Sequence, residues 1–163
     1  MFLTPGSRME GRKGRRGKRG GFVKRSYYGS SQTITIPNGA TRARVTMYGA
    51  SQGGSSIACV TTAGANGTVG VKALKDLIQG QTMVLTLGAA GAAGNGVAGG
   101  TGGTSTLAAG SQNLATLTIA GAPTNTATNF DSTIGGYPIG PAPGGAAGIN
   151  AGSAASCVID WYV

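Results

Sequence analysis

The sequence predicts an all-β protein: a small antiparallel sandwich or jelly-roll-like barrel with long Gly/Ala-rich loops, preceded by an extended basic arm. Two observations predict this class. Short stretches alternate polar and apolar side chains between Gly, Asn and Pro turns, and the 32 glycines disfavour helix. With so much glycine and only 6% aromatic residues, little apolar area is buried per residue, so we expect a homo-oligomer.

The first two strands are predicted by strict alternation. Residues 32–36 alternate, Pro37, Asn38 and Gly39 form a turn, and residues 42–48 alternate again. In the second strand Ala43, Val45 and Met47 are expected to face the core, with Arg42, Arg44 and Thr46 facing outward. Further strands are expected at residues 56–61, 68–74, 82–87, 114–119 and 156–163. A single helical turn is the most that residues 71–78 can form.

The last of these segments, residues 156–163, is the most hydrophobic part of the chain and predicts a central strand. Cys157, Ile159, Trp161 and Val163 are expected to share one face, with Val158, Asp160 and Tyr162 on the other.

Glycine is concentrated between residues 88 and 103, where Gly88, Gly91 and Gly94 recur every third position. This period permits an extended left-handed conformation packed closely against similar neighbours. A mobile surface loop is the alternative. A second Gly/Pro/Ala-rich region covers residues 134–153, and neither region contains a phosphate-binding loop motif.

Charge is segregated along the chain. Nine of the 13 Lys and Arg residues lie in residues 1–27 against Glu10 alone, which gives this segment a net charge of +8 of the total +9. Single glycines separate its cationic pairs, so residues 1–27 are predicted to be a flexible basic arm and residues 28–163 a glycine-rich β domain. Such an arm binds a phosphate backbone through counterion release without reading sequence.

Two groups of residues are the candidate site. Aromatic residues lie at the end of the arm and directly after it, either to stack on bases or to anchor the arm against a protein surface; they are Phe22, Tyr27 and Tyr28. The candidate nucleic-acid-binding residues are Arg8, Arg12, Lys13, Arg15, Arg16, Lys18, Arg19, Lys24 and Arg25.

Enzymatic activity is not expected, because the chain has no histidine and its four acids are scattered. No cofactor or metal site is expected, since Cys59 and Cys157 lack metal-ligand spacing. These cysteines are either two buried thiols on strands or a disulfide. No apolar run approaches the length of a membrane span, and the N-terminal apolar stretch is too short for a signal peptide.

From about Ser31 onward the chain resembles the glycine-rich domain of bacteriophage virion and tail proteins. The resemblance rests on residues 33–50, on the turn at residues 80–82 before a strand ending at Gly88, and on the hydrophobic closing strand. The chain departs from the pattern by having fewer consecutive glycines and more alanine after Tyr48. The arm separately is similar to the small basic genome-binding proteins of icosahedral single-stranded DNA phages.

Together these features favour a structural virion protein, as a capsid, vertex spike or decoration protein, whose arm contacts packaged nucleic acid or the inner capsid surface. Its expected partners are the viral genome, with single-stranded DNA favoured, other capsid proteins and further copies of itself, without a membrane. Its expected location is the virion, after assembly in the host cytoplasm. One alternative is a receptor-binding tail or fibre tip presenting Gly-rich loops. A second alternative is a nonviral nucleic-acid-binding protein. The β domain is predicted to have no basic face, which argues against this alternative.

Overall fold

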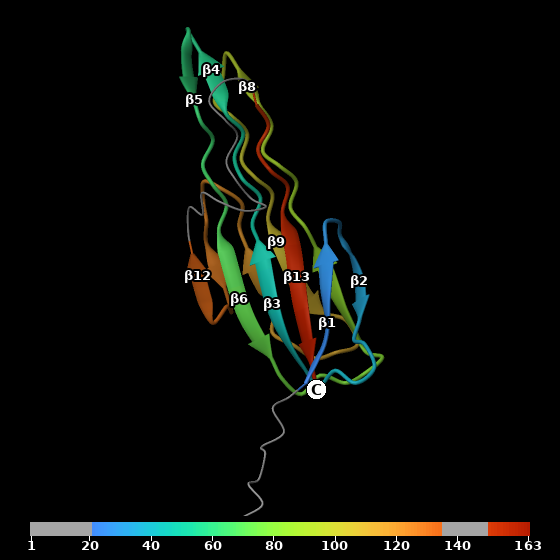
Figure 1. Ribbon diagram of the computed structural model, residues 1–163. Helices are drawn as coiled ribbons and strands as arrows, with labels where there is room; N and C mark the ends of the chain where they lie inside the picture. The colour runs from blue at the N-terminus through green and yellow to red at the C-terminus, as the bar shows by residue number, and fades with distance from the viewer. Residues whose placement is uncertain (1–20, 135–149) are drawn as a thin grey trace, which may run out of the picture.

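Two five-stranded antiparallel sheets pack face to face and form a β-sandwich (Figure 1). The computed structural model describes residues 21–134 and 150–163, in which all regular structure is β and no sheet closes into a barrel. A third, small sheet lies at the end far from the C-terminus. The prediction of an all-β sandwich is therefore confirmed, whereas the barrel alternative is not.

Sheet A has the strand order β1-β13-β3-β6-β12, and sheet B the order β11-β10-β9-β7-β2. Sheet C has the order β5-β4-β8, with β4 and β8 parallel. The strands of sheet A are β1 (Phe22–Tyr28), β13 (Ser156–Tyr162), β3 (Arg42–Tyr48), β6 (Val69–Leu74) and β12 (Ser132–Ile134). Those of sheet B are β11 (Ala127–Thr128), β10 (Leu117–Ile119), β9 (Ser105–Ala109), β7 (Thr82–Thr86) and β2 (Gln32–Thr35). Those of sheet C are β5 (Val60–Thr62), β4 (Ser55–Ile57) and β8 (Gly94–Asn95).

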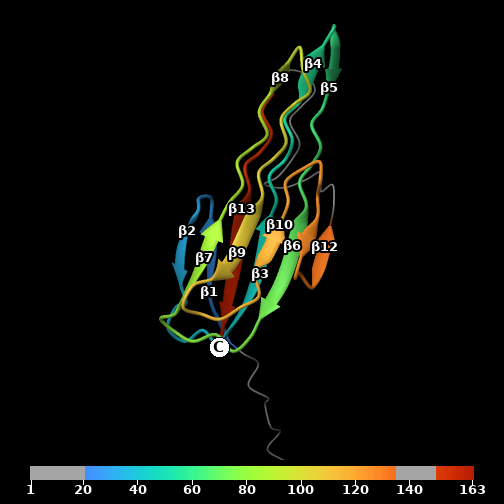
Figure 2. The ribbon, with the colours of Figure 1, turned by 180° about the vertical axis from the view of Figure 1, so that it is seen from behind.

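The core lies between sheets A and B, whose two outer surfaces appear in Figures 1 and 2. As predicted, β3 buries Ala43, Val45 and Met47 and turns its arginines outward. β13 is a central strand, as predicted, and buries Cys157, Ile159 and Trp161. Val163, expected on the same face, is 55% exposed beyond the end of the strand.

Several predicted boundaries change. Residues 56–61 are not one strand but the hairpin of β4 and β5, turned at Ala58 and Cys59 with φ of 46° and 67°. The strand predicted at 114–119 is limited to β10, and residues 71–78 contain the end of β6 instead of a helical turn. β8, β9, β11 and β12 were not predicted, because their short or Ala-rich sequences show no clear alternation.

Strand β1 corrects the predicted boundary of the arm. Six of its seven residues, all but Val23, pair antiparallel with β13, so the last part of residues 1–27 belongs to the β domain. A register shift between Phe22 and Lys24 breaks the two-residue alternation. For this reason the sequence of β1, which also contains Lys24 and Arg25, shows no clear alternation of polar and apolar residues.

Residues 49–68, 88–104 and 150–155 form the glycine-packed lobe, which extends from the sandwich and ends in sheet C (Figure 1). Its three segments run side by side and form backbone hydrogen bonds with one another. Gly91 N–H donates to Ser51 at 2.9 Å, and Gly152 N–H donates to Gly91 at 2.8 Å. This confirms close packing for residues 88–103 and corrects the alternative of a mobile surface loop.

Glycine is required in the lobe because side chains would occupy the space of neighbouring backbones. A Cβ at Gly91 would overlap the carbonyl oxygen of Gly100 and approach the amide nitrogen of Gly53 within 2.6 Å. Gly88 and Gly94, three residues before and after it, likewise meet neighbouring backbone. The period of three therefore places one glycine after another against the adjacent chain.

Gly91→Ala is expected to lower the free energy of unfolding by about 1–3 kcal/mol, the range for overpacking a filled site. Gly29→Ala is the matched control, because a Cβ there meets no atom within 4 Å, and its effect should stay within about 0.5 kcal/mol. Urea denaturation of both variants measures the difference. Equal stability of the two variants would contradict close packing in the lobe.

Candidate nucleic-acid interface

Charge is confined to one side of the described structure. Its six Lys and Arg residues all lie in sheet A or directly after β6: Lys24, Arg25, Arg42, Arg44, Lys72 and Lys75. The strands of sheet B contain no charged residue, and neither does the glycine-packed lobe. Any electrostatic attraction exerted by the described residues therefore comes from sheet A.

Strand register gathers four of these cations, Arg25, Arg42, Arg44 and Lys75, with aromatic rings on the outer surface of sheet A. Because alternate residues of β3 face the core, Arg42, Arg44 and Tyr48 point away from it. Pairing with β13 and β1 then sets further side chains beside them. We call this surface the basic–aromatic face; it consists of Phe22, Arg25, Tyr27, Arg42, Arg44, Thr46, Tyr48, Lys75, Val158, Asp160 and Tyr162.

The face is ordered in rows that cross the strands. One row joins Phe22, Tyr162 and Arg42, and the next joins Arg25, Asp160 and Arg44. In the first row the Phe22 and Tyr162 rings meet edge to face, with centroids 5.9 Å apart. Phe22 remains 60% exposed, and Tyr27, from a third row, 72% exposed.

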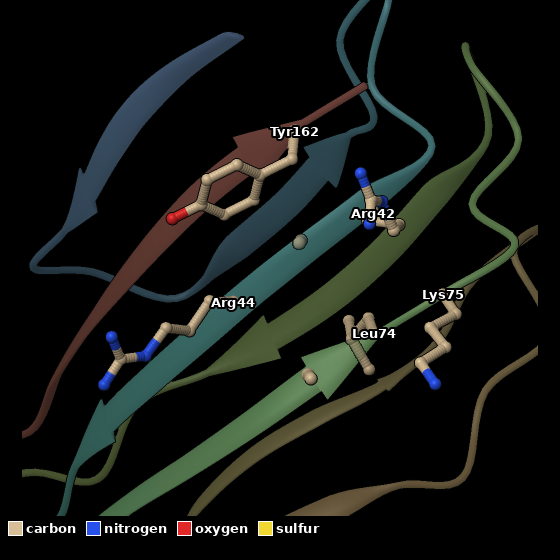
Figure 3. A pocket seen from close by; sticks show the side chains of 7 residues that line it. Arg42, Arg44, Leu74, Lys75 and Tyr162 are labelled. Atoms are coloured by element: carbon tan, nitrogen blue, oxygen red, sulfur yellow. The ribbon is translucent and has the colours of Figure 1, made fainter. Parts of the chain in front are cut away.

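Three adjoining hollows mark the face. Figure 3 shows the first, of about 280 Å³, among Arg42, Arg44, Lys75 and Tyr162. Arg44 also lines a second hollow of about 300 Å³, which includes Tyr27. Tyr27 in turn lines a third, of about 500 Å³. Shared lining residues thus connect the hollows from the end of β6 to β1.

The face has a positive net charge because four cations, Arg25, Arg42, Arg44 and Lys75, stand against one acid, Asp160. Arg25 donates to both carboxylate oxygens of Asp160, at 2.5 and 2.9 Å. This hydrogen bonding, together with the charges of Arg25 and Arg44, lowers the pKa of Asp160 below its usual range. The same contacts raise the pKa of Arg25.

The remaining cations are available to a ligand to different degrees. Arg42 donates to the backbone oxygen of Val163 at 2.6 Å, so its guanidinium is held in place. Among the described residues, Arg44 and Lys75 form no salt bridge within 4 Å. Lys72 is paired with Asp131 at 2.6 Å, beside β6 and away from the face.

The structure places the predicted site residues in different surroundings. Phe22, Arg25 and Tyr27 lie on the basic–aromatic face, and Lys24 is exposed on β1 opposite Trp161. Tyr28 instead packs against the core, and burial raises its pKa. The other predicted cations lie outside the described residues: Arg8, Arg12, Lys13, Arg15, Arg16, Lys18 and Arg19.

Sequence reasoning missed several members of the face, namely Arg42, Arg44, Tyr48, Lys75 and Tyr162, as parts of a site. The outward direction of Arg42 and Arg44 was predicted from alternation, but their neighbours depend on strand order. Because β13 lies between β1 and β3, it brings Tyr162 next to Phe22, 140 residues earlier in the sequence, and next to Arg42 on its other side.

The other reactive groups are separated. Both cysteines are free: Cys157 is buried on β13, as predicted, and desolvation raises its pKa to about 12, but Cys59 is exposed on the β4–β5 turn. Asp160 and Asp131 lie on opposite sides of β3 and β6, each in its own ion pair. In residues 21–134 and 150–163, no three His, Cys, Asp or Glu side chains are grouped as metal ligands.

Comparison with protein-family models and with curated proteins gives no match for this chain. Within the described part of the chain, no helix has the length and apolar character needed to cross a membrane.

Replacing Asp160 should change how stability depends on pH. The folded-state pKa of Asp160 lies below its unfolded value of about 3.9. Its ion pair therefore stabilises the fold above that value, and the contribution is lost as pH falls through the folded pKa. Asp160→Asn should flatten the decline in unfolding free energy below about pH 5, measured by urea titration.

Asp76→Asn is the control, because Asp76 is exposed in a loop and forms no salt bridge with any described residue. It should retain the wild-type profile. If Asp160→Asn also retained that profile, the Arg25–Asp160 pair would have no role in stability.

Proposed function

We propose that this chain is a structural virion protein, as a capsid, vertex spike or decoration protein, whose basic N-terminal segment contacts packaged single-stranded nucleic acid. The observation that carries the proposal is the position of Gly21, where that segment joins the fold. Val163 N–H donates to Gly21 at 2.9 Å, at the end of the sandwich opposite the glycine-packed lobe (Figures 1 and 2). The basic segment thus joins the charged end, while the uncharged lobe projects away.

The charge of residues 1–20 suits a phosphate partner. This segment has seven Lys and Arg residues against Glu10. Binding that releases counterions depends on the number of cations more than on their exact positions. A chain with its cations at one end and an uncharged projection at the other is suited to join a genome to the outside of a particle.

The outer surface of sheet B supports packing against copies or other capsid proteins. It is neutral and rich in threonine, and Val84 in its middle is 39% exposed. A neighbour can cover Thr86, Thr106 and Thr118 without burying an unpaired charge. We therefore include a homo-oligomer in the proposal.

A receptor-binding tip is the second candidate function, favoured by the exposed apolar residues of the lobe. Ile57 and Val60 flank the β4–β5 turn, and Val97 follows β8; they are 43%, 65% and 62% exposed. This surface is suited to contact another protein. It leaves the basic segment without a role.

The structure also removes the objection to a nonviral nucleic-acid-binding protein. The β domain was predicted to lack a basic face, and the outer surface of sheet A corrects this. The neutral sheet B surface and the projecting lobe still favour the virion proposal.

The proposal predicts salt-dependent binding of single-stranded DNA. Each neutralised phosphate contributes about −0.7 to the log–log slope of affinity against salt, so about six contacts give a slope near −4. Replacing Arg12, Lys13, Arg15 and Arg16 by serine should make the slope shallower by about 3. Fluorescence anisotropy with a labelled oligonucleotide measures both slopes.

The matched control is Arg12→Lys, Lys13→Arg, Arg15→Lys and Arg16→Lys, which keeps the charge and should keep the slope. Sedimentation velocity of the same samples reports assembly. Salt-independent binding, or a protein that stays monomeric with and without DNA, would contradict the proposal.

A further inference from the structure

We infer that the basic–aromatic face is a second binding site for single-stranded nucleic acid, at which bases stack on exposed aromatic rings while neighbouring cations contact phosphates. The inference rests on the proposed function and adds to it. The N-terminal segment supplies mainly charge, with Phe2 as its one aromatic residue, whereas this folded surface combines charge with several rings that contact bases.

The phosphate contacts follow from the unpaired cations. Arg44 and Lys75 are exposed, and no described acid forms a salt bridge with them. The one carboxylate on the face, Asp160, is held by Arg25 and is nine-tenths buried. A polyanion therefore meets positive charge along the face without facing a free carboxylate.

The base contacts follow from the exposed rings. Tyr27 is 72% exposed and Phe22 60% exposed, so both offer surface on which a base can stack. Tyr162 meets Phe22 edge to face and lines the hollow between Arg42 and Lys75. Stacking on such rings tolerates any base, because every base has a π face.

The combination favours a single strand over a duplex. In a duplex the bases are stacked on one another, so the rings would contact only backbone. A single strand can turn its bases toward Phe22, Tyr27 and Tyr162 while its phosphates reach Arg44 and Lys75. The hollows, about 280 to 500 Å³, have the size of small-ligand sites and allow flat groups to be partly enclosed.

The two sites are joined directly. Gly21 precedes Phe22, which lies in the same row as Tyr162 and Arg42. A strand held by the basic segment is therefore at high effective concentration near the face. Charge complementarity favours this occupant over a second copy of the chain, whose own face would bring like charges together.

The experiment compares the full-length protein bound to an oligothymidine of about 12 nucleotides and to an abasic oligonucleotide of equal length. Both present the same phosphates, but only the first presents bases. We expect the full-length protein to bind oligothymidine at least about 10-fold more tightly, since each stacked base contributes substantially to affinity. Anisotropy titrations at one salt concentration measure the ratio.

Variants assign this preference to the face. Tyr27→Ala and Tyr162→Ala should each reduce the oligothymidine-to-abasic affinity ratio several-fold and leave abasic binding unchanged. Tyr162→Phe keeps the ring and should keep the ratio, and Thr62→Ala on β5, in the glycine-packed lobe, should have no effect. Because Tyr27 is mostly exposed, its variant tests the inference even if Tyr162→Ala fails to fold.

Arg44→Ala with Lys75→Ala should weaken binding to both oligonucleotides and make the salt slope shallower by about 1.4. Equal wild-type affinity for the two oligonucleotides, with a steep salt slope, would overturn this inference and leave the proposed function standing. Absence of binding to either would contradict both. Tyrosine variants that lower self-association without changing the affinity ratio would assign the face to a neighbouring copy, which also overturns the inference.

Discussion

The central position of β13 in sheet A is the constraint on which the rest of the structure depends. One side of this strand buries Ile159 and Trp161 completely, and the Trp161 indole N–H donates to Ser26 at 3.2 Å. This contact and the backbone pairing hold β1 against β13. The other side of β13 carries Asp160 and Tyr162 between the side chains of β1 and β3. The hydrophobic core therefore fixes the geometry of the charged surface on the opposite side of the sheet.

A different constraint shapes the glycine-packed lobe. The segments of the lobe approach one another so closely that residues such as Gly53 and Gly91 have no room for a side chain. Backbone hydrogen bonds between neighbouring chains stabilise the lobe where large apolar side chains are scarce. The protein thus extends its fold without adding charge or a second large core. This leaves the charges of the described residues on the sandwich, at whose end the basic segment joins the fold at Gly21.

Alternation predicted β2, β3, β7 and β13 because their core-facing residues are large and regularly spaced. Alternation failed at β1, where a register shift interrupts it and charged residues mask the apolar ones. The β4–β5 hairpin was missed because Ala58 and Cys59, which are not typical turn residues, adopt positive φ. For the candidate site, the sequence predicted Phe22, Arg25 and Tyr27 individually. Their proximity to Arg44 and Tyr162 could not be predicted, since it depends on which strands are neighbours.

The central claim is that nucleic acid lies along sheet A and continues from the basic segment onto the folded domain. Photo-cross-linking of the full-length protein to an oligonucleotide containing 4-thiothymidine, followed by peptide mapping, tests it most directly. The account predicts cross-links at Phe22, Tyr27, Tyr48 and Tyr162, in addition to any within residues 1–20. Cross-links on the strands of sheet B or on the glycine-packed lobe, with none on sheet A, would contradict it.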